Sequence, residues 1–177
     1  MAPKMPQPIT ATAGGVSLVA GTTLTLSTAS VVNAAGGNIG IAGDATIKAR
    51  GLATTTSGAV VGAEARGGLA QLAASQGGSV DIAQKLNLFA EAIAAEGSLV
   101  SLSTVSNAYG GQALMTVAGG GGSLTIGGEV EANANARGGS SNSAGAGSIG
   151  DAGTAAATIN GPGLSTITGR MQLDAQG

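Results

Sequence analysis

Several residue types on which catalytic and metal sites depend are missing from this sequence. Its 177 residues include no cysteine, no histidine and no tryptophan, and only one tyrosine and one phenylalanine. Without cysteine the chain has no disulfide, no thiol chemistry and no thiolate ligand for a metal. Without histidine it lacks the side chain used most often as a general acid or base. The sequence therefore predicts no enzyme, no catalytic residue, no bound metal and no cofactor.

Charge and long apolar runs are also scarce. Only 9% of the residues are charged and the net charge is −2, so electrostatics favours neither nucleic acid nor an anionic membrane as a partner. No run of 18 apolar residues exists, and the sequence predicts no membrane span. The opening MAPKMPQPIT lacks the apolar stretch of a signal peptide. We expect a flexible lead-in over residues 1–13 and a repeat domain over 14–177, either excised from a longer protein or exported without a classical leader.

What the chain does contain is a repeat of 16 residues that begins with paired glycines or Pro-Gly. Its four clear copies start 41, 44 and 41 residues apart: Gly36–Gly51, Gly77–Ala92, Gly121–Ala136 and Pro162–Gly177. The sixth position is isoleucine in all four, at Ile41, Ile82, Ile126 and Ile167. Looser copies at Gly14–Ala29 and Gly97–Ala108 suggest a shorter period of about 20 to 22 residues.

Within each copy, apolar and polar residues alternate in two short runs separated by a bend, which is the period of a β-strand. Repeats of this length are typical of solenoids and propellers. Propeller blades usually carry Trp-Asp or other aromatic signatures, which this chain lacks, so we favour an all-β solenoid. We expect two coils per long repeat, or about seven to eight coils of 20 to 22 residues. Residues 86–96 could form a helix, but their alternating counterparts favour a strand followed by a bend.

Few side chains suggest a functional site. Three segments end in Arg-Gly-Gly or Tyr-Gly-Gly, and with a further arginine they define a candidate surface row: Arg50, Arg66, Tyr109 and Arg137. The simpler alternative is that these residues face solvent before a glycine turn. Glu129 and Glu131 share an outward face but are more simply solvated surface than a catalytic pair. Asp44, Lys85, Glu129 and Arg170 occupy one repeat position with alternating sign, which predicts an exposed charge ladder.

The sequence disfavours two ligand classes that repeat proteins bind, calcium and ice. A calcium-binding repeat needs an aspartate at a fixed spacing from its glycines, and the segment 36–44 has the wrong spacing. An ice-binding face needs threonine stacked at one outward position. The second outward position of the later strand in each copy holds Thr46, Asn87, Glu131 and Gln172, which disfavours ice binding.

The segments GGSLTIGGEVEANA, GGSVDIAQKLNLFAEA and GVSLVAGTTLTLSTA resemble the passenger regions of filamentous-haemagglutinin-type exoproteins and autotransporter adhesins. The resemblance covers roughly residues 14–177 and implies a single-stranded right-handed parallel β-helix. It implies an extracellular or bacterial cell-surface location and a non-enzymatic role as a stalk or adhesive fibre. Host or surface glycans and neighbouring repeats of a longer chain are the expected partners. The alternatives are a filament subunit that stacks end to end on copies of itself, and a carbohydrate- or ice-binding β-solenoid.

Overall fold

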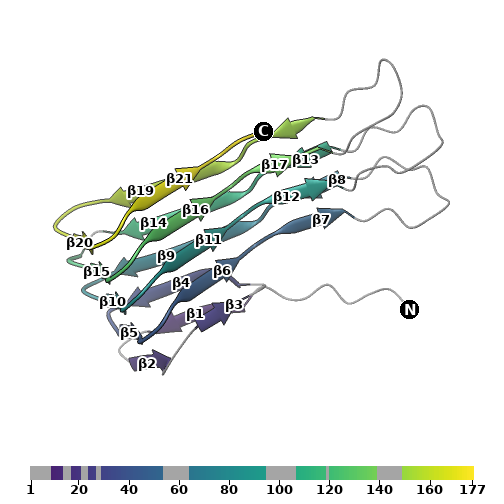
Figure 1. Cartoon of the computed structure of the whole chain (residues 1–177). Coiled ribbons are helices and arrows are strands. Elements are labelled where there is room, and N and C mark those ends of the chain that lie inside the picture. Colours follow the sequence, from purple (N-terminus) through teal and green to yellow (C-terminus); the bar gives the residue numbers. More distant parts are fainter. Residues whose placement is uncertain are drawn as a thin grey trace, which may run out of the picture.

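A computed structural model gives the fold of the chain (Figure 1). It describes the backbone of residues 9–13, 17–20, 24–26, 29–53, 64–94, 107–118, 120–138 and 149–177. Side chains are described for residues 33–51, 65–93, 107–118, 120–138 and 149–177. All regular structure in these residues is β-strand, with no helix, and every strand pair is parallel. The predicted all-β class is confirmed.

Three five-stranded sheets form the larger part of the molecule, which we call the body. Sheet A runs β1 (Ile9–Ala13), β4 (Ala29–Ala35), β9 (Leu69–Ser75), β14 (Gln112–Val117), β19 (Thr154–Ile159). Sheet B runs β2 (Ser17–Ala20), β5 (Asn38–Ile41), β10 (Ser79–Ile82), β15 (Ser123–Ile126), β20 (Leu164–Ile167). Sheet C runs β3 (Leu24–Leu26), β6 (Ala45–Lys48), β11 (Leu86–Phe89), β16 (Val130–Asn133), β21 (Met171–Asp174).

Two three-stranded sheets form a narrower extension, which we call the arm. Sheet D runs β7 (Gly51–Ala53), β12 (Ala92–Ala94), β17 (Ala136–Arg137). Sheet E runs β8 (Glu64–Arg66), β13 (Asn107–Tyr109), β18 (Gly150–Asp151). From β4 to β18 the strands visit sheets A, B, C, D and E in turn and then return to A, whereas β1–β3 and β19–β21 lie in sheets A, B and C. Strands at the same level form what we call a layer. Figure 1 shows the layers stacked, with the arm to one side of the body.

The register between layers follows the repeat that the sequence displays. Ile82 pairs with Ile41 in one neighbouring strand and with Ile126 in the other, and Ile126 pairs with Ile167. All four lie in sheet B and form one ladder of identical side chains. Equal repeat positions are therefore stacked, because a shift of one residue would turn each isoleucine to the outer face of its sheet.

The spacing of the layers differs from the expected two coils per long repeat. Only the first layer pairs at the short offset, where Leu18 faces Ile39. Later layers pair at the long offset, as Ser79 does with Asn38 and Ser123. Among the described residues the three large sheets have five strands each, where seven to eight coils were expected. The reason is that the strands between sheet C and the next strand of sheet A pair with their counterparts in the neighbouring repeats, as β13 does with β8 and β18, and build the arm.

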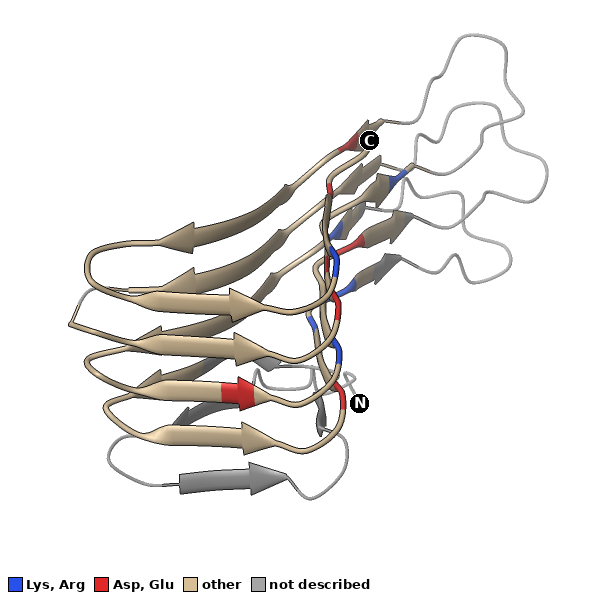
Figure 2. Ribbon diagram, turned by 60° about the vertical axis from the view of Figure 1, so that its left-hand side comes forward, with Lys and Arg blue, Asp and Glu red and all other residues tan. Residues whose placement is uncertain are grey.

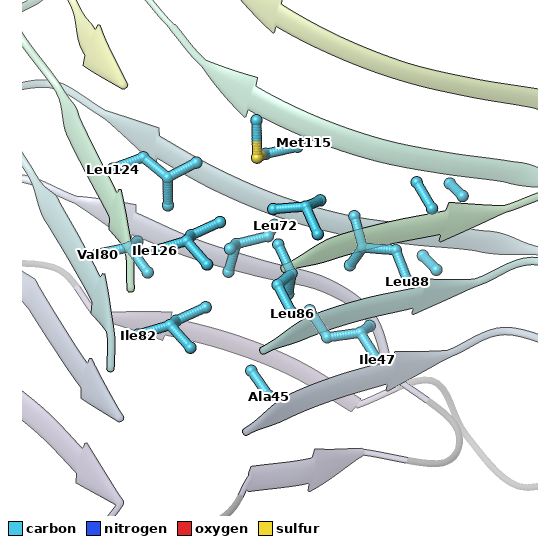
Figure 3. Packing of buried hydrophobic residues seen from close by; sticks show 14 of the residues in the cluster. Ala45, Ile47, Leu72, Val80, Ile82, Leu86, Leu88, Met115, Leu124 and Ile126 are labelled. Atoms are coloured by element: carbon cyan, nitrogen blue, oxygen red, sulfur yellow. The ribbon is translucent and has the colours of Figure 1, made fainter. Parts of the chain in front are cut away.

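Aliphatic side chains from sheets A, B and C fill the body (Figure 3). Strands β10 and β11 alternate buried and less buried residues, as the period-two pattern predicts. The largest fully buried side chains are Ile39, Ile47, Leu72, Ile82, Leu86, Leu88, Leu124, Ile126, Val80, Val117 and Val130. They come from all three sheets, so the sheets pack around one shared core.

The arm has a much smaller core. Four alanines, Ala65, Ala92, Ala108 and Ala136, form the separate buried cluster between sheets D and E. Alanine suffices here because the two sheets approach closely. Between body and arm the chain narrows to a waist, where the amide of Gly111 donates to the carbonyl of Ala90 at 2.7 Å.

The same waist hydrogen bond recurs in the other layers that have an arm. Gly68 donates to Ala49 at 2.7 Å, and Gly153 donates to Ala134 at 2.9 Å. A methyl group on Gly111 would lie 2.0 Å from the carbonyl oxygen of Gly68, which is far inside van der Waals contact. A methyl group on Gly67 or Gly110 would likewise lie 2.2 Å from a backbone carbonyl oxygen, whereas on Gly68 its nearest neighbour would be Ala49 Cβ at 3.2 Å. Gly67, Gly110 and Gly111 are therefore needed for close backbone approach.

Three further predicted segments lie wholly or partly within the described residues. Residues 86–94 form strands β11 and β12, as predicted over a helix. Ile9–Ala13, which we placed in the lead-in, form β1 and pair with β4, while residues 1–8 lie outside the described part. Most of the looser copy at 97–108 also lies outside it.

Candidate interaction surfaces

Charge is distributed unequally over the outer faces of the body (Figure 2). The strands of sheet A carry no charged residue, and those of sheet B carry only Asp81. The outer face of sheet C and the bends beside it carry Asp44, Lys48, Arg50, Lys85, Glu91, Glu129, Glu131, Arg170 and Asp174. The body therefore presents one charged face and one uncharged face.

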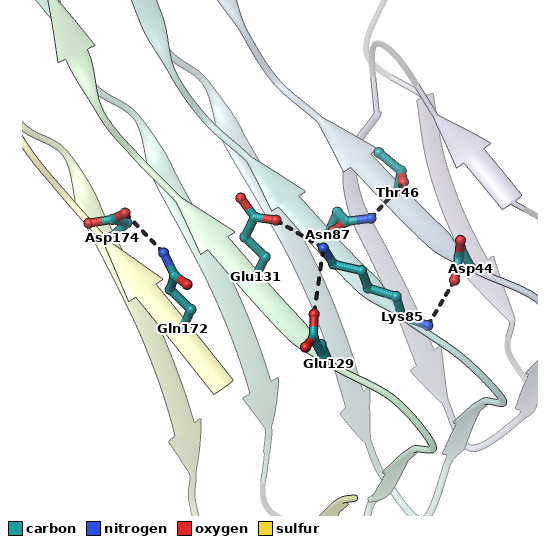
Figure 4. A network of polar contacts seen from close by, with 8 residues as sticks. All are labelled: Asp44, Thr46, Lys85, Asn87, Glu129, Glu131, Gln172 and Asp174. Carbon is teal, nitrogen blue, oxygen red and sulfur yellow. Dashed lines mark hydrogen bonds and ion pairs between the residues drawn. The ribbon is translucent and has the colours of Figure 1, made fainter. Parts of the chain in front are cut away.

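A polar network runs across the layers on sheet C (Figure 4). Lys85 Nζ lies 3.2 Å from Glu131 Oε2 and 3.9 Å from Glu129 Oε2. The backbone amide of Lys85 donates to Asp44 Oδ1 at 2.9 Å. One lysine therefore contacts both glutamates, and the three side chains together keep a net charge of −1. Lys85 and Glu129 belong to the charge ladder that the sequence predicts. Each exposed ion pair of this kind contributes at most about 1 kcal/mol to the free energy of unfolding.

The corner between sheets C and D holds a second cluster, centred on Phe89. Arg50 forms an ion pair with Glu91, whose side chain is mostly buried, although the contact lacks the alignment of a hydrogen bond. The Arg50 guanidinium lies 5.0 Å from the centroid of the Phe89 ring, and Lys48 Nζ lies 5.9 Å from it. Two cations of the layer below therefore lie against the only phenylalanine.

On sheet E, Arg66 and Tyr109 occupy paired positions of neighbouring strands, and Asp151 pairs with Tyr109 on the other side. The Arg66 guanidinium lies 4.5 Å from the centroid of the Tyr109 ring, which is a close cation–π contact. Asp151 was not among the predicted residues. Its strand has only two residues, so the alternation that marks other strands is too short to be read there.

The remaining members of the predicted row lie elsewhere. Arg137 is on sheet D, where it pairs with Ile93 of the neighbouring strand. Arg50 lies in the corner cluster with Phe89. The structure thus brings Arg66 and Tyr109 together, and it places Arg50 and Arg137 on other parts of the surface.

The outer face of sheet A is uncharged but has hydrogen-bonding side chains. Gln71 Nε2 donates to Thr116 Oγ1 at 3.2 Å, and Ser75 Oγ donates to Asn33 Oδ1 at the same distance. Thr116 also pairs with Thr158 of the next layer. On sheet C, the row tested for ice binding is in register but is not threonine, since Thr46 pairs with Asn87 and Asn87 with Glu131.

Neither a metal centre nor a membrane helix is found in the parts of the chain that the structure describes. There, no three carboxylates gather closely enough to hold a metal ion. Within the same residues, no helix is long and apolar enough to cross a bilayer. No family model, no curated protein and no solved structure matches the chain.

Proposed function

We propose that the chain is a structural and adhesive β-solenoid of an extracellular or bacterial cell-surface protein, and that it is not an enzyme. In this proposal one strand path winds right-handedly, with each layer forming one coil. The resemblance to filamentous-haemagglutinin-type passenger regions supports the handedness and the location. The in-register stacking of equal repeat positions, as in the isoleucine ladder of sheet B, is the observation on which the proposal rests.

The stacking supports this role because it places outward positions in register as well as core ones. Side chains at one outward position therefore form a row along the layers, such as Thr46, Asn87 and Glu131. A row of this kind suits many weak contacts along an extended partner, and weak contacts that act together give strong overall attachment. Host or surface glycans are the partners that we propose for the adhesive role.

The chemistry of the surface gives no basis for a hydrolase mechanism. Paired carboxylates in glycoside hydrolases differ in protonation because their environments differ. Glu129 and Glu131 instead share one environment, since the ammonium group of Lys85 lies 3.9 Å from one carboxylate and 3.2 Å from the other. A non-enzymatic role follows from this arrangement as part of the proposal.

An adhesion assay tests the proposal. Beads coated with the chain are expected to adhere to host-cell surfaces more strongly than beads coated with an unrelated protein, and to release when glycans are removed enzymatically. Beads carrying the heat-unfolded chain are the matched control. Adhesion no better than that of the unrelated protein, or release of sugar from the glycans by the chain, would contradict the proposal.

A second candidate is the binding of an uncharged polymer or ice by sheet A. The observation that favours it is the uncharged outer face on which Thr116 and Thr158 are stacked. Thr116→Lys on this face is expected to abolish such binding, whereas Thr125→Lys on sheet B is the control for an added charge. If both variants bind equally well, sheet A is not the binding face.

A further inference from the structure

The fifth layer presents core-type side chains to the outside. Ile159, Met171 and Leu173 are 52%, 40% and 43% exposed. Their partners in the layer below, Val117, Val130 and Ala132, are 0%, 1% and 0% exposed. The two sets occupy the same inward positions. The difference arises because no described strand lies above β19 and β21.

The backbone of the fifth layer is also open on this side. Leu164 donates to Gly122 and Thr168 donates to Ile126, so alternate amides of β20 face the layer below. The amides between them, including that of Ser165, point to the open edge because donor directions alternate along a parallel strand. A row of unpaired donors and acceptors is a template for another strand.

The opposite end of the body is complementary to this edge. β1, β2 and β3 are the last strands of the same three sheets, with 5, 4 and 3 residues against 6, 4 and 4 in β19, β20 and β21. All strands run parallel, so β1 of one copy meets β19 of another in the same direction as β14 does. Such a contact joins different surfaces of identical chains and repeats without closing.

We propose that a second copy of this chain docks its β1–β3 layer on the β19–β21 edge, and that successive copies form a linear stack. The occupant is a second copy because the contact continues the layer-to-layer pairing that already joins each layer of the body to the next. Docking covers Ile159, Met171 and Leu173 and pairs the open amides. This inference goes beyond the adhesive role and does not depend on it.

Sedimentation velocity over a concentration series, with negative-stain electron microscopy, tests the docking. The chain is expected to grow in mass with concentration and to form unbranched stacks. Leu173→Lys places a charge in the buried contact and is expected to weaken association more than tenfold. Gln172→Lys adds the same charge to the same strand on its outer face and is expected to assemble as the parent does.

A second variant addresses the backbone of the edge. Ala157→Pro removes an amide that points to the open edge, since Thr154 and Asn160 on the same parity of β19 donate to the layer below. Proline is tolerated on such an edge, so the far-UV circular dichroism is expected to remain that of the parent while association falls more than tenfold. A chain that stays folded and monomeric throughout would overturn the inference, as would equal assembly of Leu173→Lys and Gln172→Lys. Neither outcome bears on glycan adhesion.

Discussion

The body and the arm are built from parallel strands of similar kind, but different side chains fill them. The body core combines isoleucine, leucine and valine with alanine and one methionine, whereas the buried cluster of the arm consists of four alanines. Each buried CH₂ contributes about 0.8 kcal/mol, so the body gains far more from burial than the arm does. The same parallel pairing thus supports cores of two very different sizes, and backbone pairing carries a larger share of the stability of the arm.

Truncating the body core is the change with the largest expected effect. Ile82 is fully buried between Ile41 and Ile126, so Ile82→Ala is expected to lower the free energy of unfolding by about 3 to 4 kcal/mol. Ala108→Gly, the matched truncation in the arm, is expected to cost about 1 kcal/mol. Chemical denaturation measures both, and equal losses would show that the two cores contribute alike.

Widening the waist is expected to have the next largest effect. Gly111→Ala puts a methyl group against the Gly68 carbonyl and is expected to cost about 2 to 3 kcal/mol in the free energy of unfolding. At Gly40, on the outer face of sheet B, a methyl group would meet no atom within 4 Å. Gly40→Ala is therefore the control, with a change of less than about 1 kcal/mol by the same measurement. If Gly111→Ala leaves the free energy of unfolding unchanged, the close backbone approach at the waist does not stabilise the fold.

Deleting the arm strands of one layer tests whether the body folds without them. Deletion of residues 135–152 joins Ala134 to Gly153 across a gap that a 2.9 Å hydrogen bond already spans. Among the described residues of this segment, Ala136 is the member of the buried arm cluster. We therefore expect a loss of about 1 kcal/mol or less in the free energy of unfolding and an unchanged strand signal in circular dichroism. An unfolded product would show that body and arm fold only as one unit.

The smallest expected effect concerns the cation–π contact of the arm. A double-mutant cycle with Arg66→Ala and Tyr109→Leu is expected to give a coupling of about 0.5 to 1 kcal/mol, measured by denaturation. The corresponding cycle for Lys48 and Phe89 in the body is expected to give less, because that cation lies 5.9 Å from the ring centroid and not 4.5 Å. A larger coupling for the body pair would contradict this ranking.

The sequence was sufficient to predict the strands whose inward positions repeat. Ile41, Ile82 and Ile126 recur at one repeat position, and a buried ladder is the simplest way to satisfy that recurrence. The arm was not predicted because its strands have only two or three residues, too few for alternation to be visible. Its alanines also differ little from the alanines common elsewhere in the chain. The looser copies at Gly14–Ala29 and Gly97–Ala108 predicted a short period throughout, whereas the later described layers pair at the long offset.

Of the four candidate surface residues, the sequence correctly grouped two. The shared Arg-Gly-Gly and Tyr-Gly-Gly endings identified Arg66 and Tyr109, which the structure places in contact. Arg50 and Glu91 occupy one repeat position in successive layers with opposite charge, so their ion pair was readable from the spacing. Arg137 shares the Arg-Gly-Gly ending but lies on sheet D, because the same local sequence can follow either strand of an arm.

The waist hydrogen bond has a consequence for how such a protein can change over time. In each layer that has arm strands, this bond joins the end of sheet C to the start of the next strand of sheet A. The register of the body strands is therefore independent of the length of the arm segment. The first layer passes from β3 to β4 with two residues between them, while later layers insert an arm at the same place. The number of layers thus sets the height of the molecule and each insertion sets its width, so the two dimensions can evolve separately.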